Sequence, residues 1–268
     1  DWIDTRDPSN IRKNIKKNTK LVHVESPTNP LLELCDIEAA AQICKEKNVL
    51  LSVDNTFMSP YGQRPLDLGA DITMQSSTKS LSGHSDVLGG VLATNNNDLY
   101  DKLQFMLKAT GGVPSPFDNW LTLRSTKTLA LRYQKASDNA SGLANFLSDH
   151  EKVTNVIYPG LESHPQHRLA MKQQLSPKGD IVFGAMLSID VGNTERRDDF
   201  LKRIEVFQLA ESLGSVESLV CVPFFMTHAA LPENTKLEMG LTKTLIRLSV
   251  GIEDLDDLVN DLSNALNK

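Results

Sequence analysis

The stretch VLLSVDNT, residues 49–56, decides the fold class of this chain. Four of its first five residues are apolar, which predicts a short and fully buried strand over residues 49–53. The polar residues Asp54, Asn55 and Thr56 follow directly. An unpaired carboxylate in a protein interior is costly, so Asp54 is either a capping residue or a buried charge with a partner. Its position leaves a functional role and a structural role equally open.

Similar segments lie on both sides of this stretch. Residues 20–26, 71–77 and 87–94 have the apolar and β-branched composition of strands. Residues 36–47 carry apolar side chains at helical spacing, with Asp36 as the N-cap. Strands that alternate with helices predict an α/β fold whose sheet is mostly parallel, with helices on both faces.

The second half of the chain predicts a smaller α/β domain. A Gly- and Pro-rich segment at 111–118 interrupts the chain, and one or two long helices are expected over 119–147. Further strands are predicted at 153–158, 181–190, 218–222 and 245–250, with a loop followed by a helix at 163–176 and helices at 195–204 and 254–266. The front half ends before this with an amphipathic segment at 98–108. We place the domain boundary inside the long helical stretch, which gives a large domain at 1–131 and a small domain at 132–268.

Composition excludes several classes of function. The chain has 28 Lys and Arg against 34 Asp and Glu, so its formal charge is −6, which disfavours broad binding to nucleic acid or anionic lipid. The longest apolar run, 219–226, is too short to cross a bilayer and contains a proline. Three cysteines without a C-x-x-C pair predict buried thiols and a reducing, cytoplasmic location. His164 and His167 lack a further ligand at suitable spacing, so no metal site is predicted.

The polar residues that could carry chemistry follow the front strands. The strand at 20–26 leads into Pro27-Thr28-Asn29, and the strand at 71–77 leads into Thr78 and Lys79. Ligands of open parallel sheets bind beyond the carboxyl ends of the strands, so these clusters are expected at one edge. A lysine among hydroxyl groups can bind phosphate or form a Schiff base, but an exposed loop lysine is the commoner explanation.

The combination of motifs, in order, is more specific than any one of them. The chain resembles the Cys/Met-metabolism family of pyridoxal-phosphate enzymes over nearly its whole length. The motifs that carry the resemblance are SPTNP at 26–30, VDNT at 53–56, SSTK at 76–79, GHSD at 83–86, PSP at 114–116, YPGL at 158–161, HPQH at 164–167, LAESLG at 209–214, ESL at 217–219, MTH at 226–228 and LIRLSVG at 245–251.

The resemblance implies a type I, aspartate aminotransferase-like fold and pyridoxal 5'-phosphate as the cofactor. Lys79 would form the Schiff base with the cofactor and shuttle protons, and Asp54 would pair with the pyridinium nitrogen. Ser76 and Thr78 would donate hydrogen bonds to the phosphate, and Asn29 would lie near the phenolic oxygen of the ring.

The resemblance also implies the substrate side of the site. Arg247 would bind the α-carboxylate of an amino-acid substrate, aided by the region of Ser212; without the family, Arg247 would be a strand residue in a surface ion pair. Glu211 could bind the distal ammonium of L-cystathionine, as in the γ-lyase members, or merely face solvent. The expected reaction is γ-elimination to L-cysteine, 2-oxobutanoate and ammonia. Cystathionine γ-synthase and methionine γ-lyase activities are the alternatives.

Two features of the family lack a counterpart here. Relatives carry an N-terminal stretch with a glycine-containing turn that holds the phosphate and a tyrosine that stacks on the ring, and neither can be assigned in this sequence. A non-catalytic fragment or paralogue that acts by association is therefore an alternative to the enzyme. Family members are homotetramers, so the expected partners are a small amino-acid substrate and further copies of the chain.

Overall fold

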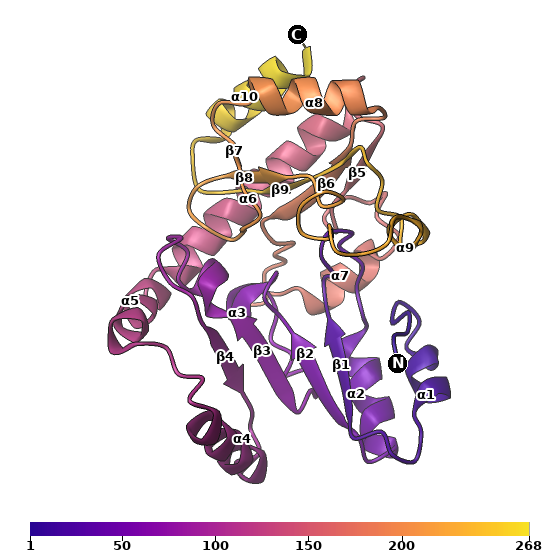
Figure 1. The fold of residues 1–268 in the computed structure, drawn as a ribbon, viewed down its shortest axis with the longest axis vertical. Coiled ribbons are helices and arrows are strands. Elements are labelled where there is room, and N and C mark those ends of the chain that lie inside the picture. Colours follow the sequence, from indigo (N-terminus) through magenta and orange to yellow (C-terminus); the bar gives the residue numbers. More distant parts are fainter. Residues whose placement is uncertain (268) are drawn as a thin grey trace. The chain divides into compact units, whose positions relative to one another are not determined.

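The computed structural model describes residues 1–267, which form two compact units (Figure 1). Unit 1 comprises Asp1–Thr28, Glu33–Leu129 and Arg168–Ile181; unit 2 comprises Asn29–Leu32, Ala130–His167 and Val182–Lys268. The main change of unit, after Leu129, lies close to the predicted boundary at residue 131. Two short segments do not follow a single boundary. Residues 29–32 belong to unit 2 although unit 1 surrounds them in the sequence, and residues 168–181 belong to unit 1 although unit 2 surrounds them.

Unit 1 is built on a four-stranded sheet with the order β1-β2-β3-β4. The strands are β1 (Leu21–Glu25), β2 (Leu50–Asp54), β3 (Ile72–Ser76) and β4 (Gly90–Ala93). The first three are parallel, as the sequence predicts, whereas β4 is antiparallel to β3. The sheet is thus mostly parallel, as predicted, and β4 is an antiparallel edge strand because only a short turn, and no full crossover helix, connects it to β3.

One helix supplies most of the core of unit 1. Helix α2 (Ile37–Glu46) begins at Asp36, whose carboxylate accepts a hydrogen bond of 3.0 Å from the Ala39 amide. Its apolar face packs on the sheet residues Leu51 and Val53, which are fully buried. Shorter helices complete the unit: α1 (Ser9–Asn14), α3 (Ser59–Gly62), the π-helical turn η1 (Ser77–Leu81) and α7 (His167–Gln173), of which only α7 was predicted. This packing holds β1, β2 and β3 in one rigid layer.

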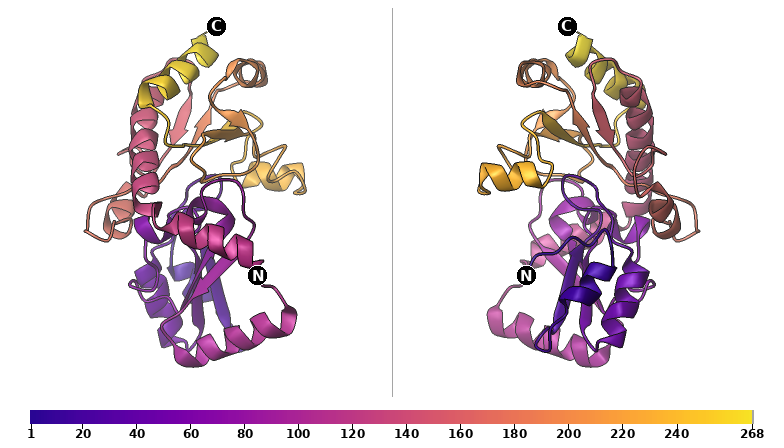
Figure 2. Two further views of the ribbon diagram at one scale, coloured as in Figure 1. Left: turned by 90° about the vertical axis from the view of Figure 1, so that its left-hand side faces the viewer. Right: turned by 90° about the vertical axis from the view of Figure 1, so that its right-hand side faces the viewer.

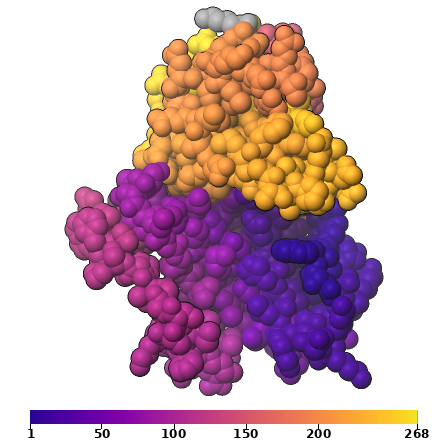
Figure 3. Space-filling model, viewed as in Figure 1, coloured from indigo at the N-terminus to yellow at the C-terminus, as the bar shows by residue number. Residues whose placement is uncertain are grey.

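Two helices at the margin of unit 1 expose much of their apolar surface. These are α4 (Asn97–Thr110), which has no buried residue, and α5 (Pro116–Thr126). In Figure 3 the segment that contains both helices projects from the rest of unit 1. The large apolar side chains that are more than half exposed there are Tyr100, Phe105, Met106, Val113, Phe117, Trp120 and Leu123. An apolar surface of this extent is typical of a protein–protein contact.

Unit 2 contains a five-stranded sheet with the order β5-β6-β9-β8-β7. The strands are β5 (Asn155–Ile157), β6 (Met186–Asp190), β7 (Gln208–Leu209), β8 (Leu219–Cys221) and β9 (Leu245–Ser249), and the helices are α6 (Leu129–Ser148), α8 (Thr194–Arg203), α9 (Glu233–Glu238) and α10 (Leu255–Asn267). All strand pairs except β7–β8 are antiparallel. The predicted helical stretch 119–147 is thus divided between α5 and α6.

The core of unit 2 lies between this sheet and its long helices. Helices α6 and α10 cover the same face of the sheet in both views of Figure 2. Their buried residues, such as Leu143 and Leu262, pack with Leu187 and Leu248 of the two central strands. Strand β9 is central in the sheet and buried along its whole length, so the backbone that carries Arg247 is held rigidly.

The three cysteines are free and buried. Burial raises the pKa of Cys35 to about 12 and that of Cys44 to about 11, so these thiols are inert as nucleophiles at neutral pH. The prediction that they act as small apolar residues is confirmed. None of the helices in residues 1–267 is long and apolar enough to cross a bilayer. Within the same residues, no group of three or more His, Cys, Asp or Glu side chains is arranged to hold a metal ion.

Asp190, at the end of β6, joins several loops of unit 2. Its carboxylate accepts hydrogen bonds from the hydroxyl groups of Thr242 (2.7 Å) and Thr244 (2.9 Å) and from the amide of Gly192 (2.8 Å). Burial alone would raise the pKa of Asp190, but the hydrogen bonds more than offset burial and hold the pKa below its ordinary value. The ionised form therefore stabilises the folded state above pH 4 and loses this effect as the pH falls through the lowered pKa.

We therefore expect Asp190→Asn to lower the free energy of unfolding by about 1–3 kcal/mol at pH 7. The difference in the free energy of unfolding between this variant and the unmodified chain should shrink when the pH is lowered from 5 to 3. Protonation of Asp190 then removes its charge, and the neutral carboxyl group resembles the amide of the variant. Urea denaturation across this pH range measures both effects. The exposed Asp149→Asn serves as the matched control. A stability difference that stays constant with pH would contradict the assignment.

Candidate functional site

The structure places the predicted site residues in two groups, one in each unit. The group in unit 1 consists of Asp54, Ser76, Thr78 and Lys79, and the group in unit 2 consists of Asn29, Glu211, Ser212 and Arg247. The first group lies at the carboxyl ends of β2 and β3, which are parallel neighbours. The second group gathers around β9, to which the loop after β7 is hydrogen-bonded.

Asp54 is the last residue of β2 and is held by the loop that follows it. Its Oδ1 accepts a hydrogen bond of 2.9 Å from the amide of Thr56. The hydroxyl oxygen of Thr56 in turn accepts a bond of 2.9 Å from the amide of Ser76, at the end of β3. Thr56 thus joins the strand end that carries the carboxylate to the strand end that leads to Lys79.

A buried network of amide side chains supports this loop. Asn55 is fully buried and donates to the carbonyl oxygens of Ser59 (2.9 Å) and Gln63 (2.8 Å). Gln63 donates to the carbonyl of Ser26 and to Oδ1 of Asn55, and Gln173 donates to Oε1 of Gln63. Sequence analysis missed Gln63 and Gln173 because neither stands in a motif. Buried side-chain amides make a site rigid only when each of them has hydrogen-bond partners. Each of these three amides has such partners.

Lys79 lies in the π-helical turn η1, which follows β3 directly. Its backbone angles of φ −88° and ψ −135° are not helical, so the chain bends at this residue. Short π-helical turns are frequent at functional sites. Lys79 is half-buried, which restricts its ammonium group more than an exposed loop would.

Gly89 holds the turn that carries Lys79. Its carbonyl oxygen accepts hydrogen bonds from the amides of Ser77 (2.9 Å) and Thr78 (3.4 Å). Its amide donates to the Thr78 hydroxyl (3.0 Å), which donates back to the Gly89 carbonyl (3.3 Å). A Cβ atom on Gly89 would lie 2.6 Å from Oγ of Ser77, so a larger residue would displace the turn. The Thr78 hydroxyl has a single hydrogen to donate, so its hydrogen bond to the Gly89 carbonyl would have to break before it could donate to a phosphate.

Arg247, in the centre of β9, is 2% exposed, so the alternative of a surface ion pair, which the strand pattern alone would favour, is wrong. Its Nη1 donates to Oδ1 of Asn29 (3.0 Å), and its Nη2 donates to the carbonyl oxygens of Glu211 (2.8 Å) and Ser212 (3.0 Å). Burial lowers the pKa of Arg247, while Cys221 and Glu211 act in the opposite direction.

The three hydrogen-bond acceptors named above for the guanidinium group of Arg247 are all neutral oxygens. No carboxylate in residues 1–267 lies within 4.0 Å of it, and its Nε is buried without a hydrogen-bond partner in the same part of the chain. A buried cation without an anionic partner is costly. The arrangement therefore favours binding of an anion, and a planar guanidinium suits a carboxylate.

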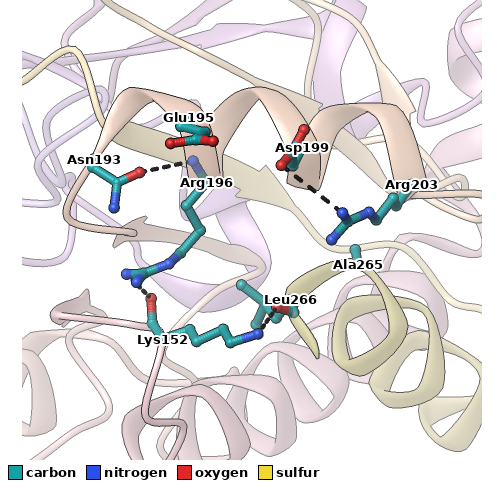
Figure 4. Close-up of a pocket in the computed structure, with 8 residues that line it drawn as sticks. All are labelled: Lys152, Asn193, Glu195, Arg196, Asp199, Arg203, Ala265 and Leu266. Carbon is teal, nitrogen blue, oxygen red and sulfur yellow. Dashed lines mark hydrogen bonds and ion pairs between the residues drawn. The ribbon is translucent and has the colours of Figure 1, made fainter. Parts of the chain in front are cut away.

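A polar groove elsewhere in unit 2 has a different character (Figure 4). It lies between α8, the end of α10 and the loop around Lys152. Its cations are already engaged: Lys152 donates to the Leu266 carbonyl (2.9 Å), Arg196 donates to the Lys152 carbonyl (3.2 Å), and Arg203 pairs with Asp199 (3.8 Å). The bond from Lys152 fastens the end of α10 to this loop, and no predicted site residue lines the groove.

Comparison with known proteins decides the family. The family profile described as Cys/Met metabolism PLP-dependent enzyme matches residues 1–267. The chain belongs to this family. It is 48% identical over 265 residues to cystathionine gamma-lyase of Bacillus subtilis, covering 99% of this chain and 68% of that protein. It is 50% identical over 267 residues to cystathionine gamma-lyase of Dictyostelium discoideum, covering 100% and 68%.

Solved structures show the same fold. Cystathionine gamma-lyase from Lactobacillus plantarum, complexed with L-serine, superimposes with a TM-score of 0.94 at 41% identity, covering 99% of this chain and 68% of that one. The protein metB from Corynebacterium glutamicum gives 0.92 at 44% identity, covering 99% and 67%. The predicted type I fold is confirmed. Among this family of PLP-dependent enzymes the chain is a carbon–sulfur lyase of the trans-sulfuration group, with pyridoxal 5'-phosphate as cofactor and an amino acid as substrate.

The donor set of unit 1 fits this cofactor chemically. A lysine can bind the aldehyde, a carboxylate can pair with the ring nitrogen, and the hydroxyl groups that follow β3 can bind the phosphate. The close approach at Gly89 leaves no room for a side chain and keeps the backbone of this turn at one position. The groups in unit 1 thus suit the cofactor, whereas Arg247 suits the carboxylate of an amino acid.

Proposed function

We propose that this protein cleaves L-cystathionine by γ-elimination. The net reaction takes up one water molecule and yields L-cysteine, 2-oxobutanoate and ammonia. The observation that carries the proposal is the loop that binds Arg247: its first residue is Glu211, whose carbonyl oxygen accepts from the guanidinium and whose side chain is exposed. A substrate with a carboxylate at one end and an ammonium group at the other suits this combination of charges.

The residues of unit 1 would share the work of catalysis. Pyridoxal 5'-phosphate, when bound, supplies an electron-withdrawing ring that stabilises negative charge at the substrate's α-carbon. We assign Lys79 as the residue that binds the cofactor aldehyde and moves protons, because a half-buried amine at a bend of the chain is both accessible and restrained. Asp54 would keep the ring nitrogen protonated, and Ser76 and Thr78 would hold the phosphate.

The residues of unit 2 would bind and orient the substrate. Arg247 would donate hydrogen bonds to the α-carboxylate, since its Nε is without a partner in residues 1–267. Ser212 contributes its carbonyl oxygen to the arginine. Asn29, which the resemblance places near the phenolic oxygen of the ring, contributes Oδ1 to the same guanidinium and would thereby fix its direction.

A comparison of substrates tests the reaction. We expect L-cystathionine to be turned over faster than L-methionine or O-succinylhomoserine, with 2-oxobutanoate as the keto acid, identified by mass spectrometry. β-Cleavage is a further alternative, because a cystathionine beta-lyase of Lactococcus lactis is 43% identical over 268 residues. Pyruvate as the keto acid would show β-cleavage and would overturn the proposal. Preference for O-succinylhomoserine would indicate a synthase.

The side chain of Glu211 provides a more specific prediction. Glu211→Val should raise KM for L-cystathionine by about 5-fold, because an exposed ion pair contributes up to about 1 kcal/mol. KM for L-methionine, whose thioether end is uncharged, should change less than twofold. The exposed Glu162→Val is the matched control, and steady-state kinetics measures both substrates. Equal losses on the two substrates would remove the role of Glu211 in binding the distal ammonium.

We further propose a two-domain organisation, a cytoplasmic location and a homo-oligomer, which the family suggests is a tetramer. Free, buried cysteines support a reducing compartment. The exposed apolar side chains of α4 and α5 support self-association. Analytical ultracentrifugation of the chain measures its oligomeric state.

A further inference from the structure

The loop at residues 211–218 is fastened to β9 at its beginning. This loop lies between β7 and β8, and the carbonyl oxygens of Glu211 and Ser212 accept from Arg247. Two residues later, the amide of Gly214 donates a hydrogen bond of 2.8 Å to the hydroxyl of Ser249. Arg247 and Ser249 are two positions apart in one strand and therefore point to the same face of the sheet.

The same loop is fastened at its other end by a carboxylate. The amide of Ser218 donates to Oε1 of Glu253 (2.6 Å), and the hydroxyl of Ser218 donates to Oε2 of Glu253 (2.9 Å). The hydroxyl oxygen of Ser218 accepts a further bond of 2.9 Å from the amide of Gly251. Ser218 is fully buried, so these charge-assisted bonds are shielded from water.

The turn that carries Glu253 is itself tightly held. The side-chain amide of Asn139, on α6, donates to the carbonyl oxygens of Gly251 (3.1 Å) and Glu253 (2.9 Å). The amide of Ile252 donates to the carbonyl of Val216 (2.9 Å). A Cβ atom on Gly251 would lie 2.2 Å from that same carbonyl oxygen, so only glycine permits this approach. Glu253 is thus anchored to α6 and can transmit a fixed position to the loop.

This anchoring matters because Arg247 is held by the loop's backbone. Two of its three hydrogen-bond acceptors described above are carbonyl oxygens of the loop, so a change in the loop's conformation would redirect the guanidinium group. We infer that Glu253 and Ser218 are positioning residues, which shape the 211–218 loop and so fix the direction in which the guanidinium group of Arg247 would bind a substrate carboxylate. The inference rests on the proposed role of Arg247 in carboxylate binding.

Glu253→Gln tests this inference, because glutamine keeps the shape of the side chain but replaces one accepting oxygen with a donor. We expect the dissociation constant of propionate, measured by NMR titration, to rise about tenfold, which corresponds to 1.4 kcal/mol. Propionate is a carboxylate without an amino group, so its binding does not depend on lyase activity. KM for L-cystathionine should rise by a similar factor while kcat changes less than threefold. Ser218→Ala should shift both constants in the same direction by a smaller factor.

Two control variants separate positioning from general stability. The exposed Glu162→Gln matches the chemical change and should leave propionate binding unaltered. Asp190→Asn should lower the melting temperature without changing propionate binding. If Glu253→Gln behaves like Asp190→Asn, with lower stability and unaltered propionate binding, the inference is overturned.

The outcome for the unmodified chain distinguishes this inference from the proposed reaction. Propionate binding that Arg247→Lys weakens, together with no cleavage of L-cystathionine, would overturn the proposed reaction alone, and the Glu253 comparison would still decide the inference. Absence of propionate binding to the unmodified chain would overturn the inference, because the positioned arginine would then have no carboxylate to bind.

Discussion

Replacement of Lys79 with alanine should lower kcat for L-cystathionine by at least about 1000-fold, within the range attributed to a positioned general acid or base. The amine lies at the bend of η1, where the clamp formed by Gly89 holds the turn. Alanine removes the amine and leaves these backbone contacts in place, so the variant should fold normally. The production of keto acid at saturating substrate measures the loss.

A chemical label provides an independent readout for the same residue. When the chain is incubated with pyridoxal 5'-phosphate and reduced with borohydride, peptide mapping should find the label on Lys79. The exposed Lys178→Ala is the control and should retain both the label and the activity. Labelling of a different lysine, or undiminished activity of Lys79→Ala, would show that the catalytic assignment is wrong. A folded chain that takes up no label would support the alternative of a non-catalytic paralogue.

Replacement of Arg247 with lysine should lower kcat/KM for L-cystathionine by at least about 100-fold, or about 2.7 kcal/mol. Lysine keeps the charge, but its ammonium group lacks the planar fork that reaches Asn29, Glu211 and Ser212 together. The lysine ammonium group cannot reach all of these acceptors at once, so carbonyl oxygens of the loop at Glu211 and Ser212 would lose their hydrogen-bond donor. Most of the effect should appear in KM.

The control for this substitution is Arg168→Lys, which makes the same change at an exposed position. It should leave kcat/KM within twofold of the unmodified chain. Circular dichroism of both variants checks that the fold is retained. If Arg247→Lys changes kcat and leaves KM unaltered, Arg247 does not bind the substrate's carboxylate in the ground state.

Local sequence patterns predicted the parts of the fold that depend on neighbouring residues. Alternation of apolar strands with helices placed β1, β2 and β3 within one or two residues of their observed bounds. Asp36 was predicted as an N-cap because capping depends on a residue three positions away, and the structure confirms it. The short elements α1, α3, β7 and α9 were missed, since a segment of two to six residues contains too little periodicity to be recognised.

The candidate site was predictable to the extent that motifs identify residue types. Asp54 ends β2 and Lys79 lies in the turn that follows β3, so their position at one edge of a parallel sheet followed from strand order. The buried state of Arg247 did not follow, because an arginine in a strand is most often exposed. The role of Gln173 in supporting Gln63 was also beyond prediction, since 110 residues separate them.

The sequence by itself determined the family, the succession of strands and helices, and the residue types available for chemistry, because each of these is encoded in short segments or in their order. The tertiary structure alone decided the direction of β4, the clamp of Thr78 by Gly89, the neutral hydrogen-bond acceptors of Arg247 and the link from Glu253 to Ser218. These features arise from hydrogen bonds and packing between segments distant in the chain. Their geometry depends on how complete elements fit together, and no local pattern of residues contains that information.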